Sequence, residues 1–294
     1  MHIGFLGFGE AARAFQESLK AKQPDLQFSA WDILLDDPDK AASMRDAMDT
    51  RGVARTDPAG LGKAEWIISA VTADQSLIAL TSIAPHLAED QLVVDINSVS
   101  PGRKKESAAL VEKAGAHYLD MAVMAPVHPR GHQTPALIAG AAIKIALPVL
   151  ERFEFSFNEA GAEPGQATAI KMVRSMFVKG LEAITVETLL AAKASGCFEE
   201  IYDSISKSYP GLGWPDFAHY EFERTLRHGK RRAAEMRESA VTISALGLNG
   251  ALAGQIADTQ DLMGALDPDL ANGSVDQIAG AVLAARLKAK SPGK

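Results

Sequence analysis

The sequence predicts an α/β fold class, with an N-terminal doubly wound parallel sheet followed by an all-α C-terminal domain. Through about residue 160, short apolar runs alternate with amphipathic helical stretches, the order of elements in a parallel sheet covered by helices. From Gly165 onward the strand patterns end, and alanine-rich helical stretches replace them. We therefore expect two domains, at residues 1–163 and 164–294.

Short apolar runs predict the strands of the sheet. Each run is bounded by Gly, Pro or Asp, and amphipathic stretches such as 11–22 and 74–87 lie between them. This spacing leaves room for one crossover helix between successive parallel strands. The runs are His2–Leu6, Leu26–Trp31, Glu65–Ala70, Gln91–Asp95 and His117–Met121.

The second half is predicted to be helical throughout. Its helical stretches are 166–195, 217–246 and 274–290, and the turn-prone segment 209–215 separates the first two. We expect residues 291–294 to fray.

Composition excludes several classes of protein. The 294 residues carry a formal charge of −7, and a general nucleic-acid binder would instead show a basic footprint. No run of about 18 apolar residues predicts a membrane span, and no basic region precedes the first apolar run as in a secretory signal. The single cysteine, Cys197, fits a reducing compartment, so we expect a cytoplasmic protein. Neither a Cys cluster nor a helical zinc motif predicts a metal site.

A glycine-rich turn follows the first apolar run and fits the pattern G-x-G-x-x-A at Gly7, Gly9 and Ala12. The first glycine permits a tight turn, the second lets the backbone approach a pyrophosphate, and the alanine lets helix and strand pack closely. A plain strand–turn–helix is the alternative. The position between a strand and a helix favours a Rossmann domain that binds NAD(P). Its predicted cofactor-binding residues are Gly7, Phe8, Gly9, Glu10, Ala11 and Ala12.

Asp32 ends the second apolar run, 23 residues after Gly9. A carboxylate near this spacing accepts hydrogen bonds from the adenosine ribose and would repel a 2′-phosphate, which favours NAD over NADP. Asp32 could instead merely end the strand. Arg45, Arg51 and Arg55 lie downstream and keep NADP open.

Small or polar residues follow the next two predicted strands. Val71 and Thr72 follow one, and Asn97 and Ser98 follow the other. Ligands of open α/β sheets bind outside the carboxyl ends of the strands, so we assign the first three to the cofactor and Ser98 to the substrate. Ordinary turn and helix-cap chemistry is the alternative.

Four segments together resemble the β-hydroxyacid dehydrogenases, the family that includes 3-hydroxyisobutyrate and 6-phosphogluconate dehydrogenases. They cover Ile3–Gly9, Asp95–Pro101, Tyr118–Asp120 and Gly165–Val173. The resemblance implies that Lys171 is the catalytic residue, and that the helical domain builds a homodimer.

Two departures from the family pattern are visible. Ser175 stands where the family has an asparagine, one turn after the lysine. Met124-Ala125-Pro126 replaces the Ser-Gly-Gly that cradles a substrate carboxylate, although we still assign these three residues to the substrate. The chain looks like a phosphogluconate-dehydrogenase-like branch with a C-terminal domain of unassigned function.

The predicted function is hydride transfer between a nicotinamide cofactor and a hydroxy acid or related alcohol. Lys171 would be the general acid/base and Ser175 would orient the substrate oxygen. Basic side chains at Lys179, Arg231 and Arg232 would bind an anionic small-molecule substrate. For the arginines, a solvated helix face with acidic partners is the alternative. A carbonyl or imine reductase on the same scaffold and a non-catalytic dinucleotide sensor remain open.

Overall fold

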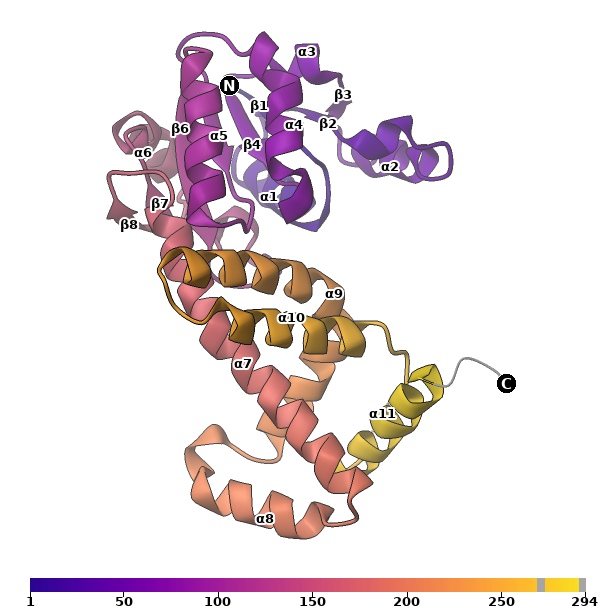
Figure 1. Cartoon of the computed structure of the whole chain (residues 1–294). Coiled ribbons are helices and arrows are strands. Elements are labelled where there is room, and N and C mark those ends of the chain that lie inside the picture. Colours follow the sequence, from indigo (N-terminus) through magenta and orange to yellow (C-terminus); the bar gives the residue numbers. More distant parts are fainter. Residues whose placement is uncertain (269–272, 291–294) are drawn as a thin grey trace. The chain divides into compact units, whose positions relative to one another are not determined.

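The computed structural model describes residues 1–268 and 273–290, and the segment expected to fray, 291–294, lies outside them (Figure 1). The chain divides into two compact units, Met1–Met172 and Val173–Lys294. The first holds the sheet and the second is helical, which confirms the predicted fold class. The division falls inside one long helix, whereas the domain boundary at 163/164 stays a prediction.

A sheet of eight strands forms the centre of the first unit, in the order β3-β2-β1-β4-β5-β6-β7-β8. All neighbouring strands are parallel except β6 and β7. The order reverses between β1 and β4, and this switch point is where doubly wound sheets bind ligands. The strands are β1 His2–Leu6, β2 Gln27–Trp31, β3 Ala54–Arg55, β4 Trp66–Ser69, β5 Leu92–Asp95, β6 His117–Val123, β7 Ala136–Ala139 and β8 Phe157–Gly161.

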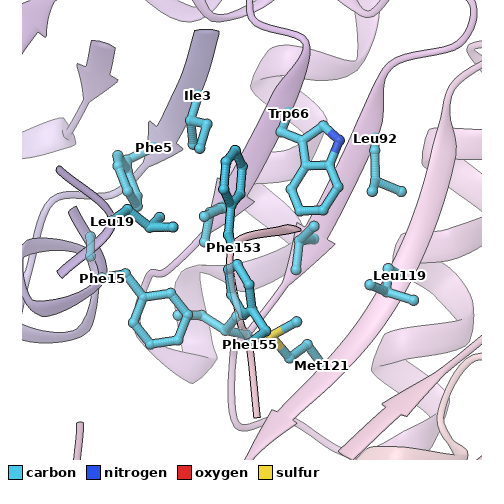
Figure 2. Packing of buried hydrophobic residues seen from close by; sticks show 14 of the residues in the cluster. Ile3, Phe5, Phe15, Leu19, Trp66, Leu92, Leu119, Met121, Phe153 and Phe155 are labelled. Atoms are coloured by element: carbon cyan, nitrogen blue, oxygen red, sulfur yellow. The ribbon is translucent and has the colours of Figure 1, made fainter. Parts of the chain in front are cut away.

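Helices cover both faces of the sheet. Alternate strand residues point to opposite faces, so the apolar strands contribute side chains to a core on each face. Trp66 and Ile68 face a core formed with α1, α2 and α6, whereas Ile67 faces a second core formed with α3, α4 and α5. Figure 2 shows part of the first core, in which aromatic side chains such as Trp66 and Phe153 pack with aliphatic ones. The helices are α1 Glu10–Lys22, α2 Ala41–Asp49, α3 Pro58–Leu61, α4 Ser76–Ile83, α5 Pro101–Lys113 and α6 Ile143–Arg152.

The second unit is built on long helices. Helices α9 and α10 cross closely at Gly229 and Gly264, where a Cβ at either position would lie within 2.7 Å of the other helix's backbone. Only glycine permits this approach without displacing a helix. The helices are α7 Gln166–Ala194, whose first residues belong to the first unit, α8 Phe198–Ser208, α9 Asp216–Ala245, α10 Gly250–Gly264 and α11 Val275–Lys290.

The five predicted strands are all present, with small differences at their ends. The sequence analysis missed β3, β7 and β8, and it did not separate α8 and α10 as helices. The break at 209–215 is confirmed, because a short 3-10 turn, Pro210–Leu212, separates α8 from α9. Within the described residues, none of the helices has the length and apolar character needed to cross a membrane.

Candidate active site

The turn after β1 has the geometry that the fingerprint predicts. Gly7 adopts a φ of +85°, and its N–H donates to the carbonyl of Trp31 at 2.8 Å. A Cβ at this position would lie 2.6 Å from Cγ1 of Val71 and 2.7 Å from the carbonyl oxygen of Ala70. Both the backbone conformation and the space therefore require glycine here.

Gly9 differs from Gly7 because a Cβ there would meet nothing within 4 Å. It is the N-cap of α1 and gives that helix no side-chain cap. The first N–H groups of α1 therefore point to an open face, which is the arrangement that binds phosphate at helix N-termini. Phe8 and Ala12 are buried, and Glu10 and Ala11 complete the first turn. A dinucleotide pyrophosphate fits this open cradle.

Asp32 lies directly beside the glycine turn. Its Oδ2 accepts the Phe8 N–H at 2.7 Å, and its Oδ1 accepts the Leu34 N–H at 2.9 Å. The two backbone donors fix the carboxylate at the carboxyl end of β2. Each carboxylate oxygen keeps a further acceptor position, so Asp32 can still receive the hydroxyl groups of a ribose.

Asn97 connects the ends of neighbouring strands β4 and β5. Its Oδ1 accepts the Val71 N–H at 2.7 Å, and its Nδ2 donates to the hydroxyl of Ser69 at 2.8 Å. Asn97 is buried, Val71 is partly buried and Thr72 is exposed. The amide thus ties the carboxyl end of β5 to that of β4, the strand next to the switch point.

Lys171 and Ser98 meet at the same edge of the sheet. The Lys171 ammonium donates to Ser98 Oγ at 2.6 Å, although 73 residues separate them in the chain. Thr168, one turn earlier on α7, donates its hydroxyl to the carbonyl of Val99 at 2.8 Å. The first turn of α7 is therefore attached to the segment after β5, and a basic group lies beside a hydroxyl at the carboxyl ends of the strands.

A buried charged cluster, which the sequence analysis missed, lies beneath this contact. It consists of Asp95, Lys104, Tyr118 and Asp120, all 1% exposed or less. The Lys104 ammonium lies 3.0 Å from Oδ1 of Asp95 and 3.3 Å from Oδ1 of Asp120. Tyr118 donates its hydroxyl to Oδ2 of Asp95 at 2.6 Å. Burial, together with both nearby carboxylates, raises the pKa of Tyr118 well above its ordinary value, so the phenol stays a neutral donor.

The three residues directly after β6 offer few hydrogen-bond donors. The Met124 N–H donates to the carbonyl of Pro135 at 2.8 Å, and Pro126 has no N–H. Ala125 and Pro126 are exposed, and Met124 is partly exposed. The three residues therefore present a mainly apolar surface at this edge of the sheet.

The other predicted residues lie in the helical unit. Lys179 is buried, donates to Ser175 Oγ at 3.2 Å and lies 3.0 Å from Oε2 of Glu235. Burial lowers the pKa of Lys179, and the charge of Glu235 opposes that shift. Arg231 also binds Glu235, at 2.7 Å.

Arg232 forms the most buried of these pairs. Its guanidinium binds both carboxylate oxygens of Glu182, and Gln260 donates to the same carboxylate at 2.8 Å. Burial lowers the pKa of Arg232 from its ordinary value, against the charge of Glu235. All three cations predicted to bind a substrate anion thus have carboxylate partners within the helical unit.

Comparison with known proteins agrees with this geometry. Residues 2–153, more than half of the chain, match the family described as the NAD binding domain of 6-phosphogluconate dehydrogenase. The chain belongs to this family. Residues 192–263 match a domain of unknown function, DUF1932. These two matches confirm the resemblance to the 6-phosphogluconate dehydrogenase family and to a branch that carries a C-terminal domain of unassigned function.

Solved structures support the same assignment. A conserved hypothetical protein from Sinorhizobium meliloti 1021 is 33% identical over 97% of this chain and 96% of its own, with a TM-score of 0.76. A conserved protein of unknown function, described as structurally similar to 3-hydroxyacid dehydrogenases, is 27% identical over 90% of this chain and 99% of its own, with a TM-score of 0.64.

The 3-hydroxyisobutyrate dehydrogenase of Mycobacterium tuberculosis, solved with L-serine, shares the fold at 18% identity. That match covers 95% of this chain and 98% of the dehydrogenase, with a TM-score of 0.70. Family and site together identify an NAD(P)-dependent oxidoreductase.

Proposed function

We propose that this oxidoreductase is a dehydrogenase of CH–OH groups in which Lys171 is the general acid/base. The observation that carries the proposal is the 2.6 Å contact between the Lys171 ammonium and Ser98 Oγ. The contact brings an ammonium beside a hydroxyl at the edge of the sheet that carries the glycine turn, and this supports a role in proton transfer. A substrate hydroxyl that replaces or joins Ser98 would meet the same ammonium.

The proton and the hydride leave the substrate separately. In the oxidation direction, the amine form of Lys171 accepts the hydroxyl proton while the carbinol C–H bond breaks and the C=O bond forms. Bound NAD(P) supplies the acceptor for the hydride. Residues Gly7–Ala12 and Asp32 would hold the cofactor, and the Asp32 carboxylate favours NAD over NADP because it would repel a 2′-phosphate.

The charge of the substrate is a second element of the proposal. We infer that an anionic group would have to displace Glu182 or Glu235 from the predicted cations, because both carboxylates already bind them. Two substrates that differ only because one carries a carboxylate and the other its amide test whether these cations bind an anionic group. Equal turnover would show that none of these cations contributes to specificity.

We also propose that the protein forms a homodimer through α7. Phe177 is 69% exposed and Ile184 is 66% exposed, and they lie seven residues apart on one face of this helix. Large apolar side chains in one exposed stripe are typical of a helix that packs against a partner. Phe177→Glu should give a monomer in size-exclusion chromatography with light scattering.

The test of the catalytic assignment is a substrate panel followed at 340 nm. Hydroxy acids, neutral alcohols, amines and the corresponding carbonyl and imine compounds are offered with NAD(H) and with NADP(H). Lys171→Met should lower turnover by about 100-fold or more and leave NADH binding nearly unchanged. Lys105→Met, an exposed lysine on α5, is the matched control and should keep full activity.

The same panel separates the two alternatives. Turnover of imines but not of alcohols or carbonyls would identify an imine reductase. Cofactor binding with no substrate-dependent change in absorbance would favour the dinucleotide sensor. Full activity of Lys171→Met would remove the general acid/base role from this residue.

A further inference from the structure

Lys104 is a completely buried lysine on α5, 0% exposed. Three oxygens surround its ammonium: the backbone carbonyl of Asp95 at 2.7 Å, Oδ1 of Asp95 at 3.0 Å and Oδ1 of Asp120 at 3.3 Å. The carbonyl oxygen accepts a hydrogen bond from the ammonium, and the two carboxylates form ion pairs with it, although Oδ1 of Asp120 accepts no hydrogen bond within the described residues. A lysine is almost never fully buried without such partners.

The two carboxylates need this cation. Asp95 and Asp120 are direct register partners on the parallel strands β5 and β6, and both are 0% exposed. Two buried carboxylates side by side repel each other strongly unless a positive group lies between them. Lys104 supplies that group, and Tyr118 adds a neutral donor to Asp95.

Each carboxylate also holds a different piece of backbone. Asp95 Oδ1 accepts the N–H of Asn97 at 2.8 Å, which sets the direction of the chain just before Ser98. Asp120 Oδ2 accepts the N–H groups of Gly165 at 3.0 Å and Thr168 at 3.2 Å, so it caps the N-terminus of α7. One ammonium thus connects the segment that carries Ser98 with the helix turn that precedes Lys171.

We propose that Lys104 is a positioning residue that holds Lys171 and Ser98 in register by joining Asp95 to Asp120. The proposal rests on the proposed function only where it treats Lys171 as the reacting group. A lysine that merely filled the core would stabilise the first unit as a whole. Lys104 instead acts on the two backbone segments that bring a basic group and a hydroxyl together.

The experiment measures the reactivity of each lysine in the full-length protein. Trace labelling with acetic anhydride at pH 8, followed by peptide mass spectrometry, gives an acylation rate for Lys171, and the other lysines serve as internal references. Lys104→Met should raise the rate at Lys171 about fivefold, the factor for losing one ordinary hydrogen bond, and leave the references unchanged. Lys105→Met, on the exposed side of the same helix, should leave the rate at Lys171 at its wild-type value.

A charge-balanced variant tests whether the loss of the cation between Asp95 and Asp120 causes the faster acylation of Lys171. Asp95→Asn combined with Lys104→Met removes one anion together with the cation, so it should reverse part of the rise at Lys171 and recover thermal stability relative to Lys104→Met alone. If Lys104→Met does not fold, this double variant is compared directly with the wild type, and faster acylation of Lys171 is still expected.

Two results would overturn the proposal. One is an acylation rate of Lys171 equal to that of the wild type in a folded Lys104→Met protein. If only the double variant folds, the same result in the double variant would count. The other is an equal rise at every lysine, which would mean general loosening. Because the labelling needs no substrate, failure of this proposal is distinct from failure of the proposed function, which full activity of Lys171→Met in the panel above would show.

Discussion

Glu221 on α9 is a buried carboxyl whose ionisation should destabilise the fold. The residue is 5% exposed, and its Oε2 has no hydrogen-bond partner within the described residues. Burial raises the pKa of Glu221 from 4.5 to about 7, although the charge of Arg224 opposes the shift. The perturbation that tests this is Glu221→Gln, which keeps the shape and removes the charge.

The sign and size of the effect follow from the two pKa values. The folded state holds the proton more tightly than the unfolded state, so stability from this group is complete below pH 4.5 and is lost as the pH rises through about 7. A shift from 4.5 to about 7 corresponds to about 3 kcal/mol at 1.36 kcal/mol per pKa unit. Glu221→Gln should therefore gain up to about 3 kcal/mol on the wild type between pH 5 and pH 8, roughly 10 °C in Tm.

The assay is thermal and urea unfolding of both proteins at pH 5, 6, 7 and 8, followed by circular dichroism. Any cost of placing an amide in this site is the same at every pH, so the change in the difference between the proteins is the quantity to read. Glu223→Gln is the matched control, because Glu223 pairs with Arg227 on the surface of the same helix and should show a small difference without this trend. A constant difference between wild type and Glu221→Gln would refute the reasoning.

Two further predictions concern glycines whose neighbours differ. Gly9→Ala should leave Tm nearly unchanged, because the added Cβ has open space. It should weaken NADH binding by about tenfold or more in a fluorescence titration, since the methyl group occupies the face proposed for the pyrophosphate. An unchanged affinity for NADH would contradict the binding of pyrophosphate at this turn. Gly229→Ala should cost roughly 3 kcal/mol in urea unfolding because its Cβ would lie 2.2 Å from the carbonyl oxygen of Gln260, whereas Gly254→Ala, in open space on α10, should stabilise by up to about 1 kcal/mol. Equal effects of these two helical substitutions would contradict the close crossing of α9 and α10.

The sequence predicted those parts of the fold that local patterns determine. Strands β1, β2, β4, β5 and β6 are mainly apolar runs between turn residues, because helices cover both faces of the sheet. Strand β3 has only two residues, and β8 carries the polar pair Asn158 and Glu159 on exposed positions, so neither has an apolar run to detect.

Long-range pairing explains what the sequence could not predict in the site. Lys104 lies on a helix that has charged residues on both sides of it, and its pattern is typical of a solvated face. Its burial depends on carboxylates from two separate strands, which sequence spacing does not bring together. In the same way, Arg232 pairs with Glu182, which lies 50 residues away in the chain. The local sequence around Arg232 therefore could not show that a carboxylate neutralises the charge of this arginine.

The measurement that tests the central claim most directly is fluorescence titration of the purified protein with NADH and with NADPH at fixed salt. The open N-terminus of α1 and the Asp32 carboxylate predict NADH binding with a micromolar Kd and NADPH binding at least ~10-fold weaker. A preference for NADPH would contradict the role given to Asp32. Binding of neither nucleotide would contradict the assignment of this chain as an NAD(P)-dependent oxidoreductase.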